Sequence, residues 1–590
     1  MLQYHIVPRD VHAHLFEVTM TLDQDQPEGT RLRLPAWIPG SYMIRDFARH
    51  LIGIQASCNG QSVPVVALDK QTWQLPPHQG VLTVTYQVYA FDLSVRTAYL
   101  DQQFGFYNHS SLCLGVEGFL EKTCEIRIET PPQYPQWRIA TGLQRLSGEA
   151  FEAGRFTAQT YDELLDHPVL MGDLAIGEFI AGGVKHSLVF AGRQYADMER
   201  ICGDLARICE YQIKLFGNEP PFQHYLFMTM VVGKGFGGLE HRNSTALVCS
   251  RKDLPASGKT LIDNDYRTFL SLCSHEYFHS WNVKSLKPKE FIPYQLEHEN
   301  YTRQLWFYEG VTSYYDDYVL HQAGLIDAPT YLGLLGDTIA RVHRGKGVER
   351  QTVTDSSLHA WTKYYKQDEN SPNAIVSYYT KGALITLCLD LLIRQQTDLR
   401  VTFADVMREL WLRYGKTGVG TEESTLVTFL QEQYKVNVHS FLERALNTTE
   451  PLPIDELLAS FGVTLSAEIA ADDNTFGGKV SPQKLPVALG AKYKASGNGL
   501  ELQVVYNDEA AHQAGLSAFD RIIAIDYLQV TDTTVREVLE RFKPEQTVTV
   551  HAFRRDELLQ LELCFQAPKA NNRILKVTDA GKAKTWLRIT

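Results

Sequence analysis

Hydrophobic and polar residues alternate along the first part of the chain, up to about residue 170. In segments such as His14–Leu22 and Gly80–Phe91, every second position tends to be apolar, and Val, Thr and Tyr are frequent. Clusters of Pro, Gly and Asn separate these segments. Because successive side chains of a strand point to opposite faces, this pattern predicts an all-β domain.

A helical period replaces the alternation near Tyr195. The apolar residues recur there every three to five positions, at Met198, Ile201, Leu205, Ile208 and Ile213. This spacing predicts an amphipathic helix. Two strands are expected next, at Tyr225–Val232 and Thr245–Ser250, on either side of the glycine-rich Gly233–Gly238. From Asp263 to about Thr449 the pattern is mainly helical, with long helices expected over Tyr378–Gln395 and Ser424–Ala445.

Pro451–Pro453 interrupts the helical pattern, and short strands with one helix, Thr534–Arg541, follow it. The expected fold class is multidomain α+β, with a β domain first, a mainly helical domain in the middle and a β domain at the end. The predicted boundaries are 1–172, 173–450 and 455–566, with a tail, 567–590, that packs back on the body.

Composition and charge exclude some functions. The 590 residues carry a net charge of −12, and no basic stripe is visible, which disfavours nucleic acid as a partner. The start of the chain does not resemble a signal peptide, and the longest apolar stretch, Gly382–Ile393, is too short for a membrane span. Nine cysteines without a CxxC pair indicate reduced thiols. The expected location is therefore the cytoplasm, with no membrane partner.

The strongest chemical signal is the segment His275-Glu276-Tyr277-Phe278-His279, which matches HExxH. On a helix, residues four apart lie on one face, so the two imidazoles can bind one metal ion. Glu276 lies to one side, where it can act as a general base on water. A chance match in a core helix is the alternative, about once in twenty chains of this length.

A catalytic zinc site needs a third protein ligand. Glu309 is the only carboxylate in the apolar and aromatic segment Leu305–Tyr315. Burying a lone carboxylate costs several kcal/mol unless it is paired or bound to a metal. Glu309 is therefore the predicted third ligand, and a buried salt bridge is the alternative.

These segments resemble a known group of enzymes. The HExxH helix followed by W-x-x-E-G is similar to the gluzincin aminopeptidases, which include aminopeptidase N and the leukotriene hydrolase. The PDZ-containing glycyl aminopeptidase family is a closer match. The four segments that carry this resemblance are Pro35–Phe47, Gly237–His241, Ser274–Asn282 and Trp306–Tyr314. The resemblance implies a thermolysin-like catalytic domain that holds one Zn²⁺ per chain.

The chain departs from aminopeptidase N in the gap between His279 and Glu309, which is longer here. His298 and Glu299 lie nearer the shorter spacing and are rival third ligands. Glu309 is preferred because only it lies in the W-x-x-E-G context.

The resemblance also assigns other site residues. The relatives stabilise the oxyanion with a Tyr in Y-x-K-G, which corresponds here to Tyr379, with Tyr378 as the fallback. Glu240 takes the place of the Glu that binds the α-ammonium group of the substrate. Gly237 and Gly238 would let the substrate backbone approach closely. The run Gly233–Gly238 matches GxGxxG, but a strand is expected after it where a nucleotide site needs a helix.

The C-terminal region resembles a bacterial PDZ domain through Glu509–Asp526. Leu489–Ala491 is its candidate carboxylate-binding loop, and Ser496–Gly499 is expected to form a hairpin turn. Phe519 and Tyr527 stand where glycine is usual, so these turns are expected to differ from those of the relatives. Capture of peptide C-termini and structural packing are both open as roles of this region.

The expected function is a zinc aminopeptidase that removes small N-terminal residues, Gly or Ala, from peptides. A zinc endopeptidase is the nearest alternative. A peptide-binding adaptor with a silent metal site is the other, but such a site has no need of Glu276.

Overall fold

The computed structural model describes residues 2–475 and 477–589. These residues form two compact units. The first unit comprises the chain up to Tyr301 together with Met407–Glu422, and the second comprises Thr302–Val406 and the chain from Glu423 onward. Each unit is described by itself.

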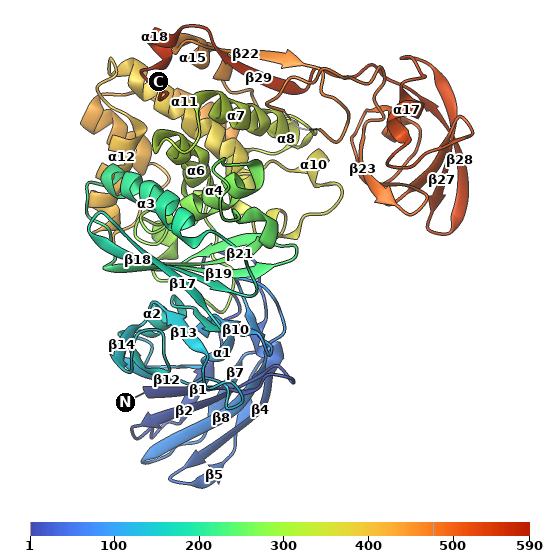
Figure 1. Cartoon of the computed structure of the whole chain (residues 1–590). Coiled ribbons are helices and arrows are strands. Elements are labelled where there is room, and N and C mark those ends of the chain that lie inside the picture. Colours follow the sequence, from blue (N-terminus) through green and yellow to red (C-terminus); the bar gives the residue numbers. More distant parts are fainter. Residues whose placement is uncertain (1, 476, 590) are drawn as a thin grey trace. The chain divides into compact units, whose positions relative to one another are not determined.

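The first unit begins with the predicted β domain (Figure 1). In strand β2 (Leu15–Asp23), buried and half-exposed residues alternate, as the sequence pattern predicts. The main sheet has eight strands in the order β14-β15-β12-β1-β2-β8-β4-β5. The other seven are β14 (Gln144–Ser147), β15 (Gly154–Ala158), β12 (Cys124–Ile128), β1 (Leu2–Asp10), β8 (Val81–Tyr89), β4 (Leu51–Cys58) and β5 (Gln61–Val63).

Two four-stranded sheets complete this domain and share its hydrophobic core. The first has the order β13-β16-β10-β9, with β13 (Arg138–Thr141), β16 (Val169–Gly172), β10 (Phe104–Tyr107) and β9 (Ala98–Leu100). The second has the order β11-β3-β7-β6, with β11 (Gly115–Val116), β3 (Thr30–Arg33), β7 (Thr72–Leu75) and β6 (Val66–Ala67).

A five-stranded sheet follows in the same unit, in the order β17-β18-β19-β21-β20. Its strands are β17 (Ala175–Ala181), β18 (Val184–Ala191), β19 (His224–Val232), β20 (Phe236–Glu240) and β21 (Ser244–Ser250). Strands β18, β19 and β21 are parallel, and β20 lies antiparallel at the edge. Helices α3 (Met198–Leu215) and α4 (Asn264–Phe278) belong to this part. Gly237 and Gly238 of the GxGxxG run lie within β20, and β21 comes next in the chain, so a strand and not a helix occupies this position.

The second unit is helical in its first half. Its helices include α5 (Leu305–Tyr308), α6 (Gly310–Gln322), α7 (Ala328–Val342), α11 (Thr380–Gln396) and α15 (Ile454–Ser460). The long helix expected over Ser424–Ala445 is wrong. The chain forms α13 (Thr425–Phe429), a π-helical turn, a break at Lys435 with φ 60°, and then α14 (His439–Asn447). Each helix buries apolar residues, Leu426 and Phe429 in α13 and Leu442 and Ala445 in α14, so the apolar pattern does not reveal the break.

A six-stranded sheet ends the second unit, with the order β23-β24-β25-β27-β28 and β26 beside β25. Its strands are β23 (Ala491–Ser496), β24 (Gly499–Val505), β25 (Arg521–Ile525), β26 (Leu528–Gln529), β27 (Thr547–Arg554) and β28 (Glu557–Cys564), and helix α17 (Val535–Leu539) packs in its core. Ser496 pairs with Gly499, as the predicted hairpin requires. The expectation that the turns at Phe519 and Tyr527 would differ is wrong, because both residues adopt positive φ, at 71° and 62°.

Strand β22 (Val463–Glu468) does not join this sheet. It pairs instead with β29 (Asn572–Val577), so that Glu468 lies opposite Asn572. The tail beyond β29 contacts the helices of the same unit. The Tyr318 hydroxyl donates to the Trp586 carbonyl at 3.0 Å, and Arg394 donates to the Thr585 carbonyl at 2.8 Å. Among the described residues, no helix is both long and apolar enough to cross a membrane.

Candidate functional site

Helix α4 carries the HExxH residues of the first unit. Its first turn is capped by Asp263, whose carboxylate accepts from the Tyr266 amide at 2.9 Å. The Nε2 atoms of His275 and His279 lie 3.0 Å apart. Nδ1 of His279 bonds the carbonyl of Asn282 at 2.8 Å. A carbonyl only accepts, so Nδ1 carries the proton and Nε2 presents a lone pair toward His275.

Two buried contacts hold α4 in place. Gln212, on α3, donates to the carbonyl of Ser274 at 2.9 Å. Tyr277, between the two histidines of the motif, shares a 2.9 Å hydrogen bond with Nε2 of His186 on β18. Burial lowers the pKa of His186 to about 4, so this ring is neutral near pH 7. The turn that carries His275 and Glu276 is therefore fixed from the side opposite to its functional face.

Glu276 lies beside Glu240 and His279. The three side chains each offer an atom within 4.8 Å of the others, and all three are buried. A Cβ atom on Gly238 would lie 2.0 Å from Oε1 of Glu276. Gly238 therefore makes room for the carboxylate of Glu276, a role that the sequence interpretation did not include.

Glu240 ends strand β20 and is only 5% exposed. The loop Pro35–Phe47 of the β domain reaches it. A Cβ on Gly40 would lie 2.4 Å from Oε1 of Glu240, and Gly40 has φ +90°. Two segments that both belong to the family resemblance, and that lie about two hundred residues apart in sequence, thus meet at this carboxylate. The sequence alone does not indicate this role of the loop.

The two residues after Glu240, His241 and Arg242, belong to a cluster of charges around Asp166. Asp166 binds Lys284 at 2.7 Å, Arg242 at 3.0 Å and Nδ1 of His241 at 3.2 Å. Burial alone would raise the pKa of Asp166, but these positive neighbours hold it well below its usual range. His241 is 1% exposed and bonded to Asp166, which supports the view that it is a structural histidine.

In the second unit, Glu309 stands at the junction of α5 and α6 and is 2% exposed. The next residue, Gly310, packs directly on Gly382 of α11. A Cβ on Gly310 would lie 2.6 Å from the Cα of Gly382. The glycines of W-x-x-E-G and Y-x-K-G therefore form one helix crossing, which brings Glu309 near Tyr379.

Tyr379 immediately precedes α11 and is half-buried, whereas Tyr378 is fully buried. Burial raises the pKa of Tyr379 well above its usual value, and the nearby Glu309 carboxylate raises it further. Tyr364 stacks on the ring, with centroids 5.3 Å apart. A phenol in this environment keeps its proton and can act as a hydrogen-bond donor.

The two rival candidates for the third metal ligand, His298 and Glu299, are not buried as Glu309 is. His298 is exposed and Glu299 is half-exposed, in the loop between α4 and α5. Neither belongs to a group of potential metal ligands among the described residues.

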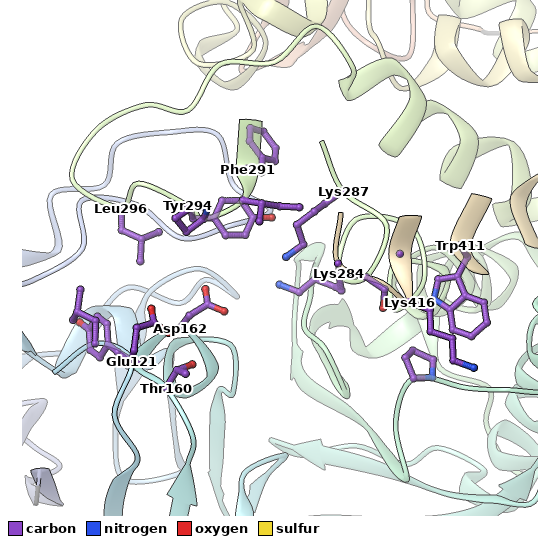
Figure 2. Close-up of a pocket in the computed structure, with 18 of the residues that line it drawn as sticks. Glu121, Thr160, Asp162, Lys284, Lys287, Phe291, Tyr294, Leu296, Trp411 and Lys416 are labelled. Atoms are coloured by element: carbon purple, nitrogen blue, oxygen red, sulfur yellow. The ribbon is translucent and has the colours of Figure 1, made fainter. Parts of the chain in front are cut away.

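The first unit also contains a large pocket of about 840 Å³. It is lined by residues such as Asp162, Lys284, Lys287, Tyr294 and Trp411, and by none of the predicted site residues. Figure 2 shows the amino groups of Lys284 and Lys287 directed to the same part of the pocket, across from Asp162. Burial, followed by the charge of Lys284, lowers the pKa of Lys287 to about 8. The predicted chemistry does not use this pocket.

Comparison with known proteins identifies relatives of this chain. Residues 3–173 match the Peptidase M61 N-terminal domain, and residues 268–385 match M61 glycyl aminopeptidase. The crystal structure of an aminopeptidase N family protein from Idiomarina loihiensis is 56% identical, with a TM-score of 0.98 and coverage of 100% of both chains. No curated protein matches the sequence.

Other solved structures are more distant. The M1 zinc metallopeptidase of Deinococcus radiodurans, as an E323A mutant bound to a Tyr-Ser-Ala substrate, is 15% identical with a TM-score of 0.49. The match covers 77% of this chain and 94% of that one. Yeast LTA4 hydrolase in complex with bestatin is 14% identical with a TM-score of 0.46, over 77% and 68% of the two chains.

The family models and the close structural relative define a peptide hydrolase of the metallo-aminopeptidase class. The chain belongs to the M61 glycyl aminopeptidase family.

Proposed function

We propose that this metallo-aminopeptidase uses zinc to remove N-terminal residues from peptides, with a preference for Gly or Ala. His275, His279 and Glu309 would hold the metal. Glu276 would act as the general base, Tyr379 would stabilise the oxyanion, and Glu240 would bind the free amino group. The preference for small residues follows from the family description, M61 glycyl aminopeptidase.

The two histidines fit a metal such as zinc. The lone pair of His279 Nε2 faces His275 Nε2 across 3.0 Å. Two nitrogens bound to one tetrahedral zinc lie about 3.3 Å apart, which is close to this separation. Zinc also accepts carboxylate oxygens such as those of Glu309. When bound, zinc would polarise the scissile carbonyl and make an attacking water acidic near neutral pH.

The chain's own residues would move the protons. The carboxylate of Glu276 takes a proton from the attacking water and passes it to the leaving amine. Tyr379 keeps its phenolic proton at neutral pH, so its hydroxyl can donate to the oxyanion. The shared crossing of Gly310 and Gly382 supports a common site for Glu309 and Tyr379.

The observation that carries aminopeptidase specificity is the pair of buried carboxylates, Glu240 and Glu276. Their oxygens lie within 4.8 Å of each other. Two carboxylates this close repel each other in a buried setting, so the site favours a positively charged ligand. The α-ammonium group of a peptide supplies such a charge at neutral pH. Glu240 would then hold the N-terminus while Glu276 serves the adjacent peptide bond.

The test compares free and N-acetylated forms of the same Gly- and Ala-initiated peptides. Free peptides should be cleaved, and acetylated ones should not. Glu240→Ala should keep its zinc and lose free-amine cleavage by about 2–4 kcal/mol in kcat/KM. Equal cleavage of both forms by the unaltered protein would indicate an endopeptidase instead.

Metal content tests the ligands. Glu309→Ala should lose bound zinc, whereas Glu299→Ala, its control from the neighbouring loop, should keep a full equivalent. Glu276→Gln should also keep zinc but lose nearly all turnover, because an amide cannot accept the proton from water. Glu240, Glu276 and His279 form a second group of potential ligands. Loss of zinc in Glu240→Ala would indicate that this second group, and not the proposed one, binds the metal.

A further inference from the structure

The loop before β23 directs two backbone amides at one carboxylate oxygen. The N–H groups of Leu489 and Gly490 donate to Oδ2 of Asp473 at 2.8 and 3.1 Å. Gly490 has φ +74°, and a Cβ there would lie 2.4 Å from the Cβ of Glu509. Adjacent amides that converge on one oxygen form an anion-binding nest, the arrangement that captures a terminal carboxylate.

The residues on either side of Asp473 contact strand β23 and helix α17, and the space between these two elements is called the groove. Oδ1 of Asn474 accepts from the Tyr493 amide at 3.0 Å, on β23, the edge strand of the sheet. Arg536 of α17 donates to the carbonyl of Ala471 at 3.4 Å. The segment Ala471–Asn474 therefore contacts both the edge strand and the helix, where a peptide bound by strand addition would lie.

Little space is left beside this segment. The cavity lined by Asp473, Val487 and Glu509 has a volume of about 20 Å³. That is room for about one water molecule and not for a side chain.

Asp473 also has a strong partner outside the loop. Arg344, which follows α7, donates to Oδ1 of Asp473 at 3.2 Å and to its carbonyl oxygen at 2.8 Å. The two side chains are 9% and 10% exposed. The Arg344 guanidinium also lies over the ring of Tyr506, 4.7 Å from its centroid. The carboxylate thus links the six-stranded sheet to the helices of its own unit.

We propose that the Leu489–Gly490 loop is a carboxylate-binding site whose resident ligand is Asp473 of the same chain. In this state, the segment Ala471–Asn474 fills the groove and excludes the free C-termini of other peptides. A tethered ligand has an effective concentration in the millimolar range, which exceeds that of a typical free peptide. The loop keeps the chemistry of peptide capture but uses it to anchor the C-terminal sheet.

The test compares Asp473→Ala with Asp556→Ala, an exposed carboxylate in the turn between β27 and β28. Both changes are made in the full-length chain carrying Glu276→Gln so that the probe is not cleaved. Hydrogen exchange is followed at the Leu489 and Gly490 amides. Binding is followed by fluorescence polarisation of an N-terminally fluorescein-labelled Gly-Ser-Gly-Ala-Ala-Val, with either a free or an amidated C-terminus.

Asp473→Ala should speed exchange at the two amides at least tenfold and should gain saturable binding of the free-carboxylate probe alone. The parent and Asp556→Ala should show neither change. The proposal is overturned if the parent already binds the probe, if exchange is unchanged in Asp473→Ala, or if that variant gains no binding. Asp473→Asn keeps an oxygen for the amides but weakens the attraction to Arg344. It should show a smaller increase in exchange, and an increase equal to that of Asp473→Ala would also count against the proposal.

Discussion

At the scale of single residues, the motif side chains depend on neighbours that lack side chains. Gly238 leaves room for Glu276, and Gly40 leaves room for Glu240. The sequence predicted the acids because each lies in a motif with local spacing. It could not predict what the glycines accommodate, because Gly40 and Glu240 are about two hundred residues apart and no local period connects them.

Gly40→Ala tests this dependence. A Cβ at this position would overlap the carboxylate of Glu240, and φ +90° is also unfavourable for alanine. We expect kcat/KM for free-amine peptides to fall by about tenfold or more, equivalent to about 1.4 kcal/mol, with metal content unchanged.

The matched control is Gly118→Ala. Gly118 has a similar φ of +84°, but an added Cβ would meet nothing within 4 Å. Gly118→Ala therefore has the unfavourable positive φ of an alanine at this backbone conformation but no steric overlap of the added Cβ. If it lost as much activity as Gly40→Ala, the contact with Glu240 would not be the cause.

At the scale of elements, two helices of the second unit meet at a pair of glycines. An added Cβ on Gly310 would overlap backbone atoms of Gly382 and Tyr378, which cannot rotate away as a flexible side chain can. The sequence predicted a helix over Tyr378–Gln395 and a mainly helical pattern around Gly310, and both glycines lie in the motifs W-x-x-E-G and Y-x-K-G. It did not predict that the two motifs contact each other, just as it did not predict the break at Lys435.

Gly310→Ala should therefore force the helices apart. We expect a loss of stability of about 1–3 kcal/mol in urea unfolding, typical of overpacking. Zinc affinity should fall with it, because Glu309 precedes the altered residue. Gly203→Ala is the control, since Gly203 lies within α3 and an added Cβ would meet nothing there. Equal effects of the two changes would rule out the crossing as the cause.

At the scale of the whole molecule, the six-stranded sheet is inserted in the sequence between β22 and β29, two strands that pair with each other. Because Glu468 and Asn572 are directly opposed in the β22–β29 pair, a two-residue Asn-Gly turn can join them. The sequence predicted a tail that packs on the body, and in the structure Thr585 and Trp586 contact helices of the second unit. The sequence did not predict the β22–β29 pair, because all the strands of the six-stranded sheet come between these two strands in the chain.

Replacing residues 469–571 by Asn-Gly should give a soluble enzyme that cleaves dipeptide-sized substrates. A chain ending at Thr449 should instead be destabilised, because it also lacks the tail residues that contact Tyr318 and Arg394. Circular dichroism and activity of the two truncated proteins provide the comparison. If the two proteins were equally inactive, the tail contacts would not be what matters.

Acid should destabilise the β domain. Burial lowers the pKa of His109 to about 3 and that of His167 to about 4. In the unfolded chain both would titrate near 6.5, so below that pH the unfolded state binds more protons. The two neutral histidines contribute fully to the free energy of unfolding above pH 6.5, and this contribution declines as the pH falls toward 4. The loss is about 2 kcal/mol for each histidine between pH 7 and 5.

The urea midpoint at several pH values measures this loss. His109→Gln, which cannot titrate, should flatten the dependence, while His298→Gln, at an exposed position, should leave it unchanged. An unchanged slope in His109→Gln would show that other groups govern acid unfolding.

The β22–β29 pair also has an evolutionary consequence. An insertion whose two ends are held side by side can be gained, lost or exchanged by recombination at two points, without changing the register of the strands that hold it. Relatives of this chain can therefore carry unrelated sequence between these strands and keep the same peptidase. Sequence similarity in the catalytic motifs therefore does not predict which domain a relative carries between β22 and β29.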